Sequence, residues 1–302
     1  MIEARGHHAV FYKFPLYSGP GQADYQIDFL GCRTQCSFVA GTAGYAGEIH
    51  TTYPSIDEEY FEWIDLLESV VEARNNYTFI ELGAGFGRWA VRAACAARHW
   101  RQPRVRLIAV EAEPRHFQWM VQHLSDNGIN PDDHMLIQAV VSEKPGNAMF
   151  YIGGPESGSN SASEWYGQAI MQPHERVAGL AHDQYENREV VKLKSGWRVI
   201  ARDSVTLKDV MKDAGVVDLI DLDVQGEEAK VISSAIETLN RQAKRLHIGT
   251  HSREIEKDIR KRLKKNDWRC LADYECLRSN ETPWGTVKFG DGVQSWVNLK
   301  LA

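Results

Sequence analysis

The sequence predicts an α/β fold with a mostly parallel sheet, helices on both faces and an antiparallel strand pair at the C-terminal end. The first observation is the alternation of short apolar runs with segments of helical periodicity, which is typical of parallel strands joined by helices. The second is the segment 286–299, which is typical of a hairpin turning at Asp291-Gly292. The expected strands are Thr78–Leu82, Arg106–Glu111, Met135–Val141, Val216–Asp223 and Arg245–Gly249. The expected helices are Arg88–His99, Arg115–Asp126, Leu207–Asp213, Glu227–Asn240 and Arg253–Asn266.

Length and composition limit the class of protein. The chain has 302 residues, of which 43% are hydrophobic and 25% charged, as in ordinary globular proteins. The net charge of -6 offers no general attraction for a phosphate backbone, so we expect no nucleic-acid partner. No apolar run approaches the ~20 residues that cross a bilayer, and the first residues lack the apolar core of a secretory signal. We therefore expect no membrane partner, and the five scattered cysteines favour a cytoplasmic location.

The pattern divides the chain into an irregular N-terminal extension, 1–54, and a main domain, 55–302. Ser55 and Glu58 form a candidate capping box before a helix whose apolar face runs from Tyr60 to Val71. An insertion, 142–200, is too long for an ordinary connection and contains a second candidate hairpin, turning at Ser195-Gly196.

The first chemical motif lies between the first expected strand and the helix after it. Gly83, Ala84, Gly85 and Gly87 form a turn that lets a nucleotide-like ligand approach the backbone closely. The spacing is G-x-G-x-G, whereas a dinucleotide fingerprint requires G-x-G-x-x-G. Glu81 precedes the glycines, where a carboxylate suits an ammonium group better than a pyrophosphate. S-adenosylmethionine has such an ammonium group and no phosphate.

Two further strand ends complete a candidate cofactor site. Glu111 and Ala112 follow the second strand, where an acid can accept hydrogen bonds from both hydroxyls of a ribose. Ala139 lies in the third strand, where small apolar side chains could hold an adenine ring.

The fourth strand has two acids within an apolar run. Asp221 and Asp223 share one face of the strand, and the ligand of an open parallel sheet lies beyond the carboxyl ends of its strands. We expect Asp221 to contribute to cofactor binding and Asp223 to reach the cofactor or the substrate.

Together these motifs resemble the FkbM family of S-adenosylmethionine-dependent methyltransferases over residues 78–275. The resemblance rests on the glycine turn, the acid after the second strand, the insertion before Thr206 and the segment IDLDVQGEE at 220–228. The family pattern in that segment is lysine, a hydrophobic residue and D-V-E-G-x-E, so Asp221 replaces the lysine and Gln225 the first glutamate. The resemblance implies a Rossmann-like class I methyltransferase that O-methylates sugars, polyketides or other small metabolites.

Three hypotheses for function follow. The leading one is methyl transfer from S-adenosylmethionine to a hydroxyl of a small molecule or glycan; the others are a nicotinamide-dependent dehydrogenase and a non-catalytic adenosyl-ligand-binding protein. Asp223 and His251 are the expected catalytic residues, because both follow strands at the same rim and an imidazole can accept a hydroxyl proton. A divalent metal held by Asp221 or Asp223 is a further alternative. The acceptor and the oligomeric state stay undetermined by the sequence.

The insertion suggests a lid over the site. Residues 153–166 are rich in glycine, serine and asparagine, and the adjacent Trp165 and Tyr166 could anchor a closed form. His174 and His182 in the same insertion are candidates for the acceptor pocket.

Overall fold

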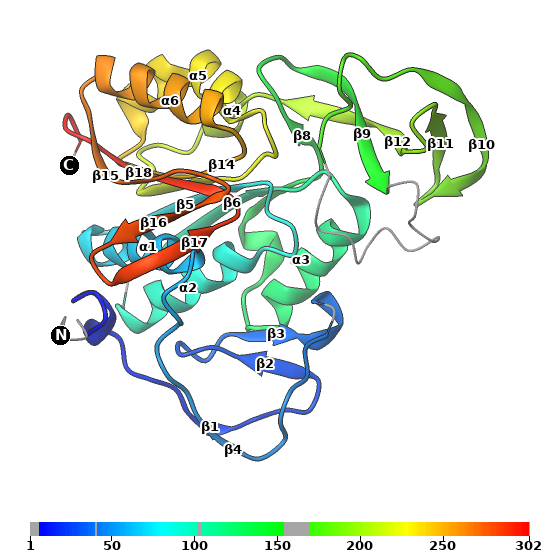
Figure 1. Ribbon diagram of the computed structural model, residues 1–302. Coiled ribbons are helices and arrows are strands. Elements are labelled where there is room, and N and C mark those ends of the chain that lie inside the picture. Colours follow the sequence, from blue (N-terminus) through cyan, green and yellow to red (C-terminus); the bar gives the residue numbers. More distant parts are fainter. Residues whose placement is uncertain (1–5, 40, 102–103, 154–168, 302) are drawn as a thin grey trace.

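A seven-stranded sheet forms the centre of the molecule in the computed structural model, which describes residues 6–39, 41–101, 104–153 and 169–301. The strand order is β15-β18-β14-β13-β5-β6-β7 (Figure 1). The five strands from β14 to β7 are parallel, and β18 is antiparallel to both β14 and β15. This arrangement confirms the expected fold class. The strands are β5 Tyr77–Leu82, β6 Val105–Val110, β7 Met135–Ile137, β13 Leu219–Leu222, β14 Arg245–Thr250, β15 Trp268–Tyr274 and β18 Gly292–Asn298.

Helices cover both faces of this sheet (Figure 1). One face carries α1 Glu59–Glu72, α2 Arg88–His99 and α3 Pro114–Asp126, and the other carries α4 Leu207–Met211, α5 Glu228–Gln242 and α6 Arg253–Lys265. Successive side chains of a strand point to opposite faces of the sheet. In β5, Phe79 therefore packs in the apolar core on the side of α1 and α2, and Ile80 and Leu82 pack in the apolar core on the side of α4, α5 and α6.

Three local predictions are wrong. Ser55 and Glu58 form no capping box: the Ser55 hydroxyl donates to Asp57, and Glu58 accepts from the backbone N–H of Gly290 at 2.7 Å. A contact that is 232 residues distant in the sequence thus replaces the local one.

The expected strand Met135–Val141 is two strands in different sheets. Only β7 belongs to the central sheet, and β8 Val140–Val141 pairs in parallel with β12 Arg198–Val205 of the insertion. The chain passes from the central sheet to the sheet of the insertion because β12 offers backbone hydrogen-bond partners to Val140 and Val141.

The hairpin expected at Asp291-Gly292 does not form. β17 Gly285–Phe289 pairs with β16 Arg278–Thr282, whereas β18 enters the central sheet between β14 and β15. Every residue of β18 is buried, so the central position hides more of this strand than a two-stranded hairpin would.

The insertion forms its own sheet beside the central one (Figure 1). It contains β8, β9 Gly146–Gly153, β10 Val177–Tyr185, β11 Arg188–Leu193 and β12, and the hairpin at Ser195-Gly196 is confirmed as the β11–β12 turn. Residues 154–166 of the expected lid, with Trp165 and Tyr166, lie outside the described residues.

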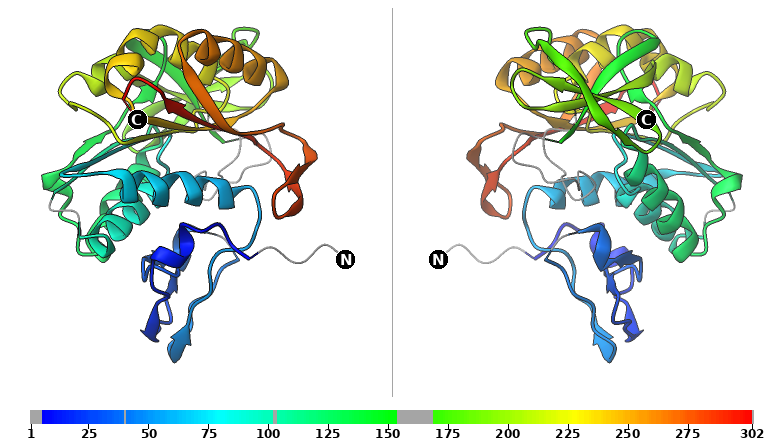
Figure 2. Two further views of the ribbon diagram at one scale, coloured as in Figure 1. Left: turned by 90° about the vertical axis from the view of Figure 1, so that its left-hand side faces the viewer. Right: turned by 90° about the vertical axis from the view of Figure 1, so that its right-hand side faces the viewer.

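The N-terminal region lies against the helices on the side away from the sheet (Figure 2). It contains the 3-10 helices η1 Phe11–Lys13 and η2 Cys36–Phe38 and the paired strands β1 Ser18–Pro20 with β4 Glu48–His50 and β2 Tyr25–Ile27 with β3 Arg33–Gln35. A third 3-10 helix, η3, spans Pro131–Asp133. Asn127 at the end of α3 both donates to and accepts from the backbone of Arg33, which fixes this region to the main domain.

Within the described residues, no helix combines the length and the apolarity that a bilayer crossing needs.

Candidate functional site

A cavity of about 830 Å³ opens at the carboxyl ends of β5 and β13. From β5 the chain continues through β6 to β7 on one side, whereas β13 and β14 lie on the other. Open α/β sheets bind ligands at such a switch point, because the two connecting segments leave in opposite directions. The volume lies in the upper part of the ~300–1,000 Å³ range of small-molecule sites.

The glycine turn after β5 lets two chain segments approach closely. Gly83 has φ +81°, and a Cβ there would lie 1.8 Å from the carbonyl oxygen of Asp223. Gly87 has φ +71°, and a Cβ there would lie 2.8 Å from Cγ of Met120. Glycine is therefore required at both positions, at Gly83 to bring the cofactor turn against the end of β13 and at Gly87 to dock α2 on α3.

Buried carboxylates accept the hydrogen bonds of the turn and of the first residues of α2. Glu81 accepts from the backbone N–H groups of Trp89 and Ala90 at 3.1 and 2.8 Å. Glu111 accepts from the N–H groups of Gly85 and Glu113, both at 2.6 Å. Burial raises the pKa of Glu81 well above its usual value and that of Glu111 to about 8. Carboxylates of the protein thus accept the hydrogen bonds of these backbone N–H groups. In a phosphate-binding turn, such N–H groups would instead point toward the bound anion.

The wall beyond Glu111 is apolar and comes from two sheets. Ala112 and Ala139 lie on it, as the sequence predicts, together with Phe86 of the glycine turn. The insertion adds Phe150 and Ile170. An apolar surface thus lies next to the carboxylate of Glu111 in this cavity.

A row of polar side chains crosses the floor of the cavity. Asp221 of β13 lies in register with Glu81 of β5 on one side and with His247 of β14 on the other. Glu62 of α1 faces the same row, and one ligand atom from each of Glu62, Asp221 and His247 lies within 4.8 Å of the others. Burial and the neighbouring Asp221 raise the pKa of Glu62 well above its usual value, and burial likewise raises the pKa of Asp221.

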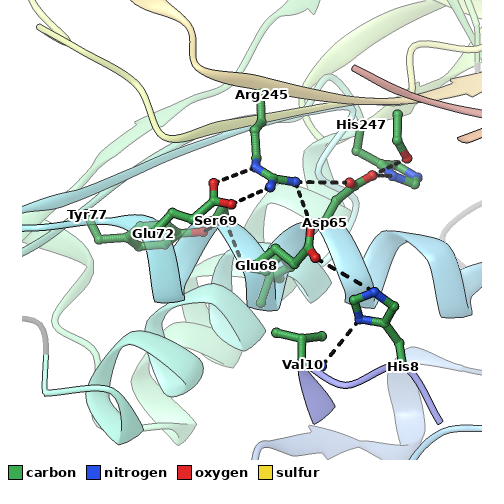
Figure 3. A network of polar contacts seen from close by, with 11 residues as sticks. His8, Val10, Asp65, Glu68, Ser69, Glu72, Tyr77, Arg245 and His247 are labelled. Carbon is green, nitrogen blue, oxygen red and sulfur yellow. Dashed lines mark hydrogen bonds and ion pairs between the residues drawn. The ribbon is translucent and has the colours of Figure 1, made fainter. Parts of the chain in front are cut away.

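A network of charges below this row fixes α1 against β14 (Figure 3). The Nδ1 atom of His247 lies 2.7 Å from Asp65, and the Arg245 guanidinium lies 3.7 Å from the same carboxylate. Arg245 also donates to Glu68 at 2.9 Å and to Glu72 at 2.7 and 2.9 Å. Burial alone would lower the pKa of His247, but the hydrogen bond to Asp65 raises it.

The expected catalytic residues lie together at the rim. The Nε2 atom of His251 lies 3.4 Å from Oδ1 of Asp223, and its Nδ1 atom lies 2.9 Å from Oε1 of Glu228. Withdrawal from solvent raises the pKa of Asp223 to about 6, against the lowering effect of His251. Burial alone would lower the pKa of His251, but the hydrogen bond to Glu228 and the charges of Asp223 and Asp291 raise it to about 9. Asp223 lines the cavity and His251 supports it from behind.

Most of the expected cofactor residues line one cavity: Glu81, Gly83, Ala84, Gly85, Glu111, Ala112, Ala139 and Asp221. Gly87 serves packing instead. Asp221 and Asp223, the two expected metal ligands, belong to different clusters, since Asp221 groups with Glu62 and Asp223 with Glu228. His174 is exposed in a turn before β10.

Sequence reasoning missed Glu62, His247 and Asp291, all of which line the cavity. His247 interrupts the apolar run of β14 as Asp221 interrupts β13, so the same signal was available. Glu62 and Asp291 gave no comparable signal, because tertiary packing alone brings α1 and the segment before β18 to the site.

The fold is Rossmann-like, and comparisons with known proteins identify the chain as a methyltransferase. A family model described as "Methyltransferase FkbM domain" matches residues 81–270. A protein of Jannaschia sp. (strain CCS1) named "Putative methyltransferase" is 28% identical over 220 residues, which cover 72% of each chain. The match of the family model shows that the chain belongs to the FkbM methyltransferase family.

Solved structures with similar folds are distant in sequence. The methyltransferase FkbM from Methylobacillus flagellatus KT is 10% identical with a TM-score of 0.42, covering 75% of this chain and 45% of that one. M. capricolum TrmK in complex with S-adenosyl-homocysteine is 6% identical with a TM-score of 0.38, covering 78% and 67%.

Proposed function

We propose that this methyltransferase transfers the methyl group of S-adenosylmethionine to a hydroxyl of a small molecule or glycan. The observation that carries the cofactor assignment is the occupation of the backbone donors in the glycine turn. Glu111 already accepts from the N–H of Gly85 in the turn and Glu81 from those of Trp89 and Ala90 at the start of α2, so a pyrophosphate would meet carboxylates instead of these donors. This favours a cofactor without phosphates over a nicotinamide dinucleotide.

The charge of the cavity supports the same choice. Its lining includes carboxylates from five separate segments, among them Glu58, Glu62, Asp221, Asp223 and Asp291. S-adenosylmethionine has an ammonium and a sulfonium group against one carboxylate, so its net positive charge suits this lining. Two phosphates would be repelled by it.

In the proposed reaction the hydroxyl oxygen attacks the methyl carbon, the bond from methyl to sulfur breaks, and S-adenosylhomocysteine leaves. The protein contributes mainly alignment, because a sulfonium needs little further activation. Asp223 faces the cavity and accepts the hydrogen bond, and then the proton, of the hydroxyl. His251, surrounded by carboxylates, is charged at neutral pH and acts by positioning Asp223.

Calorimetry tests the cofactor. We expect saturable binding of S-adenosylhomocysteine, no binding of NADH, and at least tenfold weaker S-adenosylhomocysteine binding in Glu111→Gln, which replaces one acceptor oxygen by a donor. Binding of NADH without S-adenosylhomocysteine would refute the assignment. Transfer of labelled methyl to hydroxyl compounds then tests the reaction, and cofactor binding without transfer to any acceptor offered would favour a non-catalytic binding protein.

A further inference from the structure

The Nε2 atom of His251 lies in an unusual environment at the rim of the cavity. It is 3.4 Å from Oδ1 of Asp223 and 3.7 Å from Oδ1 of Asp291. The atom is buried, and within the described part of the chain it has no hydrogen-bond partner. Three separate segments therefore direct donor atoms toward one point without bonding to each other: the end of β13, the end of β14 and the start of β18.

The other ring nitrogen shows how the imidazole is held. Nδ1 lies 2.9 Å from Oε1 of Glu228, a fully buried residue that also accepts from the backbone N–H of Gly226. A carboxylate can only accept, so Nδ1 donates to Glu228, and a metal ion on the other side of the ring would replace the proton that Nε2 carries in the charged imidazole. A carboxylate behind an imidazole is the usual way to orient a metal-binding histidine.

Glu228 gives a second, independent indication of a missing positive charge. Its Oε2 atom is buried and, among the described residues, has no hydrogen-bond partner. One ligand atom from each of Asp223, Glu228 and His251 lies within 4.8 Å of the others, which is a compact cluster with more carboxylates than imidazoles. A cation on the Nε2 side of the ring would offset this charge.

We propose that a divalent first-row transition metal, of the Mn²⁺ or Zn²⁺ kind, binds between His251 Nε2, Asp223 and Asp291, with Glu228 orienting the imidazole. A mixed imidazole and carboxylate set favours such ions over Mg²⁺ and Ca²⁺. Donors bound ~2.1 Å from one ion lie roughly 3.0–3.5 Å apart. The distances of 3.4 and 3.7 Å from Nε2 to the two carboxylates require little movement to reach that arrangement.

The ion deepens the proposed function, on which its role in catalysis rests, because Asp223 lines the cavity. An acceptor hydroxyl bound to the ion loses its proton more easily and is held in a fixed position. Oδ1 of Asp223 would then bind the ion, and its second carboxylate oxygen would take the proton of the hydroxyl, as in the proposed reaction. Acceptors with two adjacent oxygens, which chelate an ion, would be preferred.

Metal titration of the 302-residue chain tests the site without any cofactor or acceptor. After treatment with EDTA and dialysis, MnCl₂ is added and free Mn²⁺ is counted by electron paramagnetic resonance, with ZnCl₂ calorimetry in parallel. We expect one saturable site, weakened at least tenfold in His251→Ala and in Asp291→Asn. The side chain of Asp291 is 49% exposed, so this second substitution leaves folding intact, as a thermal unfolding curve would verify.

Asp221→Asn is the matched control, because Asp221 belongs to the other three-residue cluster. We expect it to leave the metal affinity within twofold of wild type. Absence of saturable binding up to millimolar metal would overturn the proposal, and so would binding that Asp221→Asn removes and His251→Ala does not. Titration of the same metal-free sample with S-adenosylhomocysteine separates a failure of this proposal from a failure of the proposed function.

Discussion

Replacement of Gly83 by alanine tests whether the glycine turn positions both the cofactor and the end of β13. The new Cβ would lie 1.8 Å from the carbonyl oxygen of Asp223, whereas ordinary contact begins at 3.4 Å. The turn and the segment at Asp223 must therefore separate by about 1.6 Å. Gly215→Ala is a matched control, because Gly215 has a similar φ of +72° and nothing within 4 Å of the added atom.

The difference between the two variants isolates the steric effect. A non-glycine residue with positive φ costs about 1 kcal/mol, and we expect this loss in both variants. Overpacking adds ~1–3 kcal/mol at Gly83 alone, so the loss of unfolding free energy there should be roughly 2–4 kcal/mol. Urea unfolding measures both values. Calorimetry should show at least tenfold weaker S-adenosylhomocysteine binding in Gly83→Ala and wild-type affinity in Gly215→Ala. Equal losses of stability and affinity in the two variants would refute the reasoning.

Three further predictions concern charges and hydrogen bonds around the site. Arg245→Met should reduce the unfolding free energy by ~3–5 kcal/mol, because it removes a cationic partner from the buried Asp65 and the partly buried Glu68. Lys230→Met, which removes an ion pair with an exposed lysine, should cost under ~1 kcal/mol, and equal urea curves for the two variants would contradict this. Burial lowers the pKa of His123 to about 4, so the unfolded chain binds the extra proton and stability should fall by roughly 3 kcal/mol as pH drops from about 6.5 to 4. His123→Gln should lose that part of the pH dependence in urea unfolding, and an unchanged profile would exclude the residue as its source. Tyr185→Phe leaves the buried Glu113 carboxylate short of one donor and should cost ~1–3 kcal/mol, whereas no change in urea midpoint would show that the bond to the insertion is dispensable.

The central α/β pattern was predictable because its signals are local. The bounds of α2 match the expectation residue for residue, since Gly87 marks its start and its alanine-rich face repeats with helical period. The acids at the end of β13 were recognisable for the same reason: Asp221 and Asp223 interrupt an apolar run, and a buried carboxylate such as Asp221 is rare without a role.

Partners distant in the sequence decided the parts that could not be predicted. An apolar run such as Met135–Val141 does not show that its last two residues pair with β12, which lies about 60 positions later. An Asp-Gly pair favours a turn but does not show which strand β18 will join. Glu62 contributes to the site only because the charge network around Arg245 holds α1 against β14.

The acidic lining of the cavity also explains how the protein tolerates so many carboxylates before a ligand binds. Glu81 and Glu111 each accept two backbone N–H bonds, and burial raises the pKa of both, that of Glu111 to about 8, so that Glu111 can hold a proton near neutral pH. Glu62 and Asp221 lie close enough to share a proton. Asp221 raises the pKa of Glu62, and the hydrogen bond with Glu62 lowers the pKa of Asp221. These arrangements reduce the negative charge of the free site. A cofactor with a net positive charge can then replace those protons, whereas an anionic cofactor would meet a lining in which carboxylates outnumber cationic side chains. The proposed preference for S-adenosylmethionine therefore rests on the protonation and hydrogen bonding of the site as well as on the spacing of its glycines.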